Sequence, residues 1–302
     1  MTHMSIQASI RSNVAKTYFL MAGFIAFVIL FSYVLSQGLG YGNSFMWLAV
    51  LLSIGSSLIS YYWGDSLVLA ISGARPADRK RDFDFFTVAE NLSIAAGIPK
   101  PRLYVIEDTA MNAFATGRDP KHAVICATTG ILDRLDRREL EGVIAHELSH
   151  VKNFDIRLMA VVAVLVGSVA YMADIFLRTL WWGGRGRDRD DNNSLGPILL
   201  VVGIVLAILS PILASIIQLA VSRNREFLAD VSGAELTRYP EGLARALEKL
   251  DKDKEVLEAA TNATAHLYIT NPFKDKNFGA WFAGLFNTHP PIEERIKRLR
   301  AM

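Results

Sequence analysis

Residues 136–153 have the sequence DRRELEGVIAHELSHVKN, and this stretch predicts one amphipathic helix. Asp136 is a favourable N-cap, and Glu139 three residues later completes a capping box. Apolar side chains recur at helical spacing and mark the buried face, namely Leu140, Val143, Ile144 and Val151. Polar residues interrupt this apolar helix within little more than one turn, at His146, Glu147 and His150. This interruption of the apolar pattern indicates a functional site on the helix.

Residues 146–150 match the pattern H-E-x-x-H, which is typical of zinc proteases. Residues four apart lie on the same face of a helix, so the imidazoles of His146 and His150 can reach one ion. Zinc accepts imidazole nitrogen as a ligand. Glu147 is then placed to take a proton from a water that the metal activates. The alternative is a solvated helix whose histidines merely face polar neighbours, and the apolar surroundings argue against it.

A third ligand has to come from elsewhere, because a catalytic zinc normally has three protein ligands and a water. The other histidines, the single cysteine and the carboxylates are all chemically suitable. Glu226 stands out, because it follows two hydrophobic segments that begin just after His150, and two crossings would return the chain to the same side. The same reasoning holds if neither segment crosses. Asp230, one turn beyond Glu226, can accept the N–H of a ligating histidine.

Membrane segments are predicted from composition, because hydrophobic residues make up 51% of the 302 residues. No charged residue occurs between Lys16 and Asp65 or between Asp191 and Arg223. A membrane-spanning helix needs about 20 apolar residues. Four segments qualify, at about residues 18–35, 45–62, 158–177 and 198–221.

The orientation follows from basic residues in short loops, which stay on the cytoplasmic side. Arg11 and Lys16 precede the first segment, and four basic residues between positions 75 and 81 follow the second. The N-terminus and the central region are therefore expected in the cytoplasm, although the arginine-rich loop at 178–191 opposes this for the later pair. The first apolar run is too long for a secretion signal and is expected to be an uncleaved anchor.

The domain organisation predicted from these segments has four parts. Residues 1–72 form a transmembrane hairpin, 73–156 the first part of a catalytic domain, 157–222 a second hydrophobic hairpin and 223–302 the second catalytic part. Helices are predicted at 82–96, 240–250 and 292–302, strands at 103–106 and 123–127, and a third extended segment at 112–117. The predicted fold class is mainly α with a small β-sheet, as a multi-pass membrane protein with a zincin-type domain.

Several functions are disfavoured by composition. A net charge of +2 gives no reason to expect a nucleic-acid partner. The single cysteine, Cys126, excludes an internal disulfide and is expected to be a small buried residue. His3, His122 and His266 are expected to be structural or solvated. A di-iron carboxylate site would need a second E-x-x-H element, which the sequence lacks.

Four motifs together resemble a known family. They are Asn112-Ala113-Phe114-Ala115, His146 to His150, Glu226-Phe227-Leu228-Ala229-Asp230, and Thr288-His289-Pro290-Pro291-Ile292-Glu293-Glu294-Arg295. In this order, among four hydrophobic segments, they are similar to the membrane gluzincin proteases of the HtpX type, relatives of the CAAX prenyl proteases. The resemblance implies one zinc per chain, with Glu226 as the third ligand.

The resemblance also implies roles for two further segments. Residues Asn112 to Ala115, together with the strand at 123–127, would form an edge on which an extended substrate pairs. His289 would reach the active site, either as a donor to the oxyanion or as a plug on the open zinc position. Otherwise, His289 next to a proline would be an ordinary turn residue.

The implied activity is hydrolysis of misfolded or damaged membrane proteins, or of other unfolded polypeptides, at the cytoplasmic side of the cell inner membrane. The lipid bilayer is then the second expected partner. The alternative is a scaffold or holdase in which zinc is structural and His289 supplies a permanent fourth ligand.

Overall fold

The computed structural model describes residues 3–39, 43–168, 223–261, 263–273 and 290–302. The predicted segment 198–221 and His289 lie outside these residues. Of the predicted segment 158–177, residues 158–168 are described, and they are helical. The division of the chain into four parts stays a prediction.

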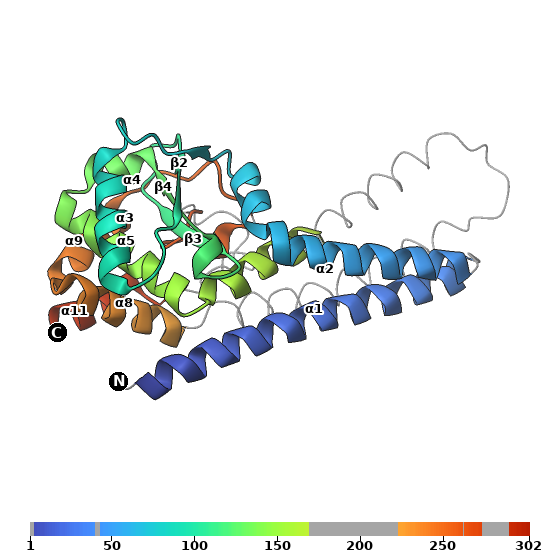
Figure 1. Ribbon diagram of the computed structural model, residues 1–302. Coiled ribbons are helices and arrows are strands. Elements are labelled where there is room, and N and C mark those ends of the chain that lie inside the picture. The colour runs from blue at the N-terminus through green and yellow to red at the C-terminus, as the bar shows by residue number, and fades with distance from the viewer. Residues whose placement is uncertain (1–2, 40–42, 169–222, 262, 274–289) are drawn as a thin grey trace.

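Two long helices lie side by side and run in opposite directions, α1 (His3–Leu39) and α2 (Asn43–Ile71) (Figure 1). They contain the first two predicted membrane segments. Within the described residues, one helix is long and apolar enough to cross a membrane, in α1 at Ile10–Leu30. Large apolar side chains are exposed along both helices, for example Phe19 and Leu51. Crossing by α2 stays a prediction.

The β-sheet is small and mixed, as expected. It has the strand order β1 (Arg75–Pro76), β2 (Arg102–Ile106), β4 (Ala123–Thr128) and β3 (Ala113–Gly117). Strands β2 and β4 are parallel, and the other neighbours are antiparallel, with Phe114 opposite Cys126. The three predicted extended segments are thus confirmed as β2, β3 and β4.

Both faces of β3 and β4 are covered, which explains why these strands are apolar at consecutive positions. One set of alternating side chains, including Ala115 and Ile125, packs in a core with α3 (Phe83–Ala96) and α5 (Arg137–Lys152). The other set, including Phe114 and Cys126, packs against Val68 of α2 and residues after position 158. Cys126 is buried, as expected.

Five further helices are described in this part of the chain, and three of them, α3, α8 and α9, pack against the central helix α5 (Arg137–Lys152). They are α3 (Phe83–Ala96), α4 (Thr129–Arg134), α8 (Arg223–Thr237), α9 (Pro240–Lys252) and α11 (Ile292–Arg300), with short 3-10 turns at Pro120–His122 and Ala265–Leu267. The predicted capping box of α5 is confirmed, because Asp136 accepts the Glu139 N–H and the Glu139 side chain accepts the Asp136 N–H.

Two glycines let neighbouring helices approach α5 closely. A Cβ at Gly142 would lie 2.6 Å from the backbone nitrogen of Leu243 in α9, and one at Gly233 of α8 would lie 3.1 Å from the nitrogen of His146. Any larger residue would push these helices apart. The close packing of α8 on α5 brings the acidic residues of α8 beside the two histidines.

Candidate metal centre

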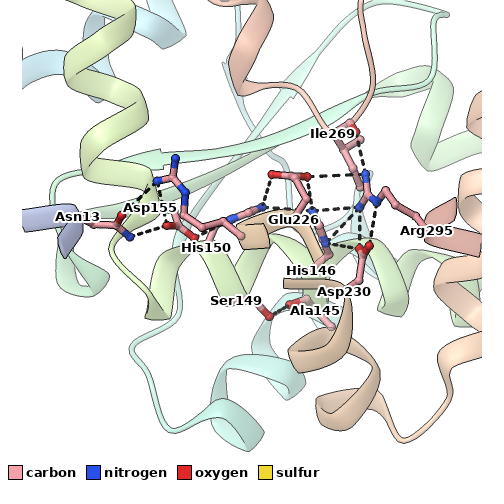
Figure 2. A network of polar contacts seen from close by, with 11 residues as sticks. Asn13, Ala145, His146, Ser149, His150, Asp155, Glu226, Asp230, Ile269 and Arg295 are labelled. Carbon is pink, nitrogen blue, oxygen red and sulfur yellow. Dashed lines mark hydrogen bonds and ion pairs between the residues drawn. The ribbon is translucent and has the colours of Figure 1, made fainter. Parts of the chain in front are cut away.

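Helix α5 presents both histidines of the motif to one buried point. The Nε2 atoms of His146 and His150 lie 3.2 Å apart, and the two rings are nearly perpendicular, at 89°. Glu226 enters from α8, with Oε2 at 3.7 Å from His146 Nε2 and Oε1 at 3.6 Å from His150 Nε2 (Figure 2). All three side chains are buried.

These three side chains fit a zinc ion by chemistry and by spacing. Their ligand atoms lie within 4.8 Å of one another. Two ligand atoms at about 2 Å from a tetrahedral ion are roughly 3.3 Å apart, close to the separation of the two Nε2 atoms. Two imidazole nitrogens with one carboxylate are a donor set that catalytic zinc uses. The site can therefore hold a metal ion.

The Nδ1 atom of His146 lies 2.9 Å from Asp230 Oδ1, where the sequence placed this carboxylate. Asp230 is in turn bound by a buried guanidinium, since Arg295 Nε donates to Oδ2 at 2.9 Å and Nη2 donates to Oδ1 at 2.7 Å. Arg295 has no exposed surface and comes from α11. Another donor of the same guanidinium reaches the carbonyl oxygen of Ile269.

The Nδ1 atom of His150 lies 2.9 Å from Asp155 Oδ2. This partner depends on a turn after α5, where Phe154 has a positive φ of 59° and a new helix begins at Asp155. The second oxygen, Asp155 Oδ1, accepts a hydrogen bond of 2.6 Å from the side-chain amide of Asn13 on α1 (Figure 2). With both Nδ1 atoms facing carboxylates, each ring turns Nε2 toward the shared point.

Charges around the site shift the pKa of several groups. Burial raises the pKa of Asp230, but the Arg295 charge and the hydrogen bond with His146 outweigh it and hold the value at about 2. Burial lowers the pKa of His146. Burial also opposes the charged form of His150, but the Asp155 hydrogen bond and the Glu226 charge raise its pKa to about 9. The two ligand histidines are thus shifted in opposite directions, His146 toward the neutral form and His150 toward the charged form.

Glu147 is buried beside the ligands and faces strand β3. Burial raises the pKa of its carboxyl group to about 7, and its carboxylate accepts a hydrogen bond from the backbone N–H of Ala115. A pKa near neutrality suits a group that accepts and releases a proton at physiological pH. The motif helix and the predicted substrate edge therefore meet at Glu147.

The four residues predicted to bind substrate lie at or beside the edge strand β3, but part of its outer edge is occupied by the chain itself. The Ile269 N–H donates to the Ala113 carbonyl at 3.0 Å, and the Asn112 amide donates to the Thr270 carbonyl at 3.1 Å. The Phe114 side chain packs in the core, with its ring centroid 5.1 Å from that of Tyr268. Any substrate pairing has to start beyond Ala113 or displace Ile269.

Two of the remaining histidines have hydrogen-bond partners away from the metal centre, in agreement with a structural or solvated role. His122 Nδ1 lies 2.8 Å from Asp119 at the surface, and His266 Nε2 lies 3.1 Å from the Met159 carbonyl oxygen. Three residues around the site were missed from the sequence, namely Asn13, Asp155 and Arg295. An acidic residue five positions after the second histidine was the only local signal for Asp155.

Two histidines one helical turn apart, a glutamate between them and a second glutamate from another helix define the class of zincin-type metallopeptidases. The profile of peptidase family M48 matches residues 80–302, and the chain belongs to this family. It is a membrane metalloprotease, as the sequence predicted. Membership of a peptidase family gives no support to the scaffold alternative.

Similar proteins span the whole chain. A protease HtpX homolog of Caldanaerobacter subterraneus subsp. tengcongensis is 44% identical over 313 residues, covering 100% of this chain and 99% of the relative. A protease HtpX homolog of Thermoanaerobacter pseudethanolicus is 43% identical, covering 96% and 95%. The crystal structure of S. mikatae Ste24p aligns with a TM-score of 0.49 at 17% identity, covering 98% of this chain and 67% of that one.

Proposed function

We propose that this chain is a zinc-dependent endopeptidase that cleaves misfolded or damaged membrane proteins, and other unfolded polypeptides, at the cytoplasmic side of the cell inner membrane. The observation that carries this proposal is the position of the Glu147 carboxylate. It is buried and follows His146 directly on α5, beside the cluster of His146, His150 and Glu226.

The proposed reaction assigns one role to each residue. A zinc ion held by His146, His150 and Glu226 would polarise the scissile carbonyl and lower the pKa of a water molecule. Glu147 accepts the proton of the attacking water on its carboxylate and then delivers it to the leaving amine. Asp230 fixes the ring of His146 through Nδ1.

Substrate binding is proposed at the outer edge of β3. An extended peptide would pair with backbone groups there, which gives affinity with little sequence preference. The hydrogen bond from the Ala115 N–H to the Glu147 carboxylate supports this edge, because it shows that β3 runs next to the proposed base. Because Ile269 occupies the Ala113 carbonyl, the peptide would pair from Ala115 toward Gly117.

The location at the membrane is supported by α1 and its flanking charges. The apolar stretch Ile10–Leu30 is long enough to cross the bilayer, and Arg11 and Lys16 lie near its N-terminal end. We propose further crossings at 45–62, 158–177 and 198–221. A site close to the bilayer would act on polypeptides that are themselves held there.

His289 is proposed to act in the site in one of two ways. If His289 is an oxyanion donor, replacing it with alanine should slow cleavage by ~10²-fold. If His289 instead blocks the open metal position, the same replacement should accelerate cleavage. The direction of the change in rate on a loosely folded membrane protein decides between them.

The proposed function is tested by Glu147→Gln in the detergent-solubilised protein. This variant should keep one zinc per chain and lose proteolysis of a loosely folded membrane protein by at least ~10²-fold, because the proton acceptor is gone. Glu141→Gln, on the same helix and paired with surface arginines, is the matched control and should cleave normally. Full proteolysis by Glu147→Gln would refute the proposal.

A further inference from the structure

The support of His150 extends out of the catalytic domain into the N-terminal helix. Asp155 is buried and uses one oxygen for His150 Nδ1 and the other for the Asn13 amide. Asn13 is 2% exposed and lies on α1 inside the stretch Ile10–Leu30. A helix that otherwise looks like a membrane anchor thus lies two side chains away from a candidate metal ligand (Figure 2).

The amide of Asn13 is held in one orientation by its partners. Its nitrogen donates to Asp155 Oδ1 at 2.6 Å and to the carbonyl oxygen of Asn153 at 3.1 Å. Its oxygen accepts from Arg225 Nη1 at 3.1 Å. A buried amide is costly unless its groups are paired, and here the NH2 group and the oxygen both find partners. These partners determine which side-chain atom of Asn13 is the nitrogen and which is the oxygen.

The orientation of Asp155 depends on that amide. Arg225 Nη1 also lies 3.4 Å from Asp155 Oδ1, so the carboxylate has a cation close by on the side away from His150. With the amide in place, Oδ1 is held by Asn13 and Oδ2 remains on the histidine. Without the amide, Oδ1 would lose its shortest hydrogen bond and keep only the longer contact with Arg225 at 3.4 Å, so the carboxylate would be held less firmly against His150.

We propose that Asn13 is a positioning residue for the metal ligand His150, acting through Asp155, so that metal affinity depends on the docking of helix α1 against the catalytic domain. This inference rests on the proposed metal site at His146, His150 and Glu226. It links the anchor in the bilayer to the metal centre by hydrogen bonds, with no residue of α1 touching the metal.

The test is a double-mutant cycle on zinc affinity in the full-length, detergent-solubilised chain, measured by competition with a chromophoric chelator. Asn13→Leu should weaken zinc binding about 10-fold, and Asp155→Asn about 10- to 100-fold, the range for partners of ligating histidines. The double variant should bind zinc no more weakly than Asp155→Asn alone, because Asn13 acts through Asp155.

Thr17→Val is the matched control, because Thr17 is buried on the same face of α1 and its hydroxyl bonds to the Asn13 backbone carbonyl. Its zinc affinity should stay within about twofold of the wild type. The absorption spectrum of the Co²⁺-loaded chain should change in Asn13→Leu and not in Thr17→Val, since only the former alters the ligand geometry.

Other results would overturn either the role of Asn13 or the metal centre on which it rests. Unchanged zinc affinity in Asn13→Leu, or losses that add up in the double variant, would overturn the proposal. If Asn13→Leu and the smaller Asn13→Ala both unfold the zinc-free chain, Asn13 only docks the helix and the proposal is also overturned. If the wild type itself binds no zinc, the proposed metal centre fails, which is a different result from a normal wild type with an insensitive Asn13.

Discussion

The two histidines of the metal centre each face a carboxylate, but the groups that hold these two carboxylates differ. Each Nδ1 faces a buried carboxylate, Asp230 for His146 and Asp155 for His150, both at 2.9 Å. Asp230 is then bound twice by the guanidinium of Arg295, at 2.9 and 2.7 Å. Asp155 is bound at 2.6 Å by the neutral amide of Asn13, and Arg225 Nη1 reaches the same oxygen only at 3.4 Å.

The support of His146 therefore lies within the catalytic domain, whereas the support of His150 depends on the position of α1. An arginine stays charged and grips a carboxylate with two donors, so the side of His146 is fixed once the catalytic domain has folded. The side of His150 relies on an amide from α1, a helix that reaches away from the domain (Figure 1). We therefore expect losses at Arg295 to affect folding and losses at Asn13 to affect the metal.

The largest effect on stability is expected from Arg295→Met. The change leaves Asp230 as a buried charge without its cation, which costs about 3–5 kcal/mol. Thermal and denaturant unfolding of the zinc-free chain should show this loss. Arg298→Met, on the same helix but exposed, is the control and should cost less than about 1 kcal/mol. Equal losses in the two variants would contradict a structural role for Arg295.

Next in size is the pair Asp230→Asn and Asp155→Asn. Both should weaken zinc binding by about 10- to 100-fold, because each removes the acceptor that orients a ligating imidazole. Asp230→Asn should also lower the stability of the zinc-free chain, since it leaves Arg295 without its counter-charge. Chelator competition and thermal unfolding on the same samples measure both quantities. The comparison breaks if Asp155→Asn is the more destabilising of the two.

A smaller loss is expected from Gly233→Ala, which moves α8 with Glu226 and Asp230 together. The new Cβ would lie 3.1 Å from the His146 nitrogen, so α8 has to shift by a few tenths of an ångström. Overpacking of this kind costs about 1–3 kcal/mol and should also weaken zinc binding. Ser232→Ala, the neighbouring change on α8, serves as control, and indistinguishable melting temperatures would count against the close packing.

The smallest effect is expected at Ser149, which lies inside the motif but supports neither histidine. Its hydroxyl bonds to the Ala145 carbonyl one turn earlier, at 2.9 Å. Ser149→Ala removes a bond that competes with the helix and introduces the best helix former, so stability should change by less than about 0.5 kcal/mol. Proteolysis should stay within twofold of the wild type. A large loss of activity would show that the motif helix has a further functional face.

The sequence predicts what depends on neighbours along the chain. The capping box at Asp136 and Glu139, the helix predicted at 82–96 and the strands around Cys126 all follow from local chemistry. The predicted membrane segment at 18–35 is shorter than α1. The charges of Arg11 and Lys16 place the predicted start after them, whereas the helix itself continues through both residues.

The residues that hold the two carboxylates in place could not be predicted in the same way. Asn13 lies 142 positions from Asp155, and Arg295 lies 65 positions from Asp230. An asparagine between Arg11 and Lys16 looks like an ordinary polar residue ahead of an apolar segment until the fold brings its partners beside it. Glu226 was singled out because it follows the two hydrophobic segments that begin just after His150, and because the family resemblance implied it as the third ligand. Pairings over such distances depend on tertiary structure, which hydrophobic periodicity does not encode.

The central claim is that His146, His150 and Glu226 hold the zinc on which proteolysis depends. The most direct measurement titrates zinc into the metal-free, detergent-solubilised chain and follows bound zinc and cleavage of a loosely folded membrane protein in the same samples. Cleavage should rise in proportion to bound zinc and stop at one zinc per chain. Glu226→Gln should bind zinc more than ~10²-fold more weakly, and the exposed control Glu235→Gln should bind it normally. Full cleavage by the metal-free chain, or wild-type zinc affinity in Glu226→Gln, would contradict the account.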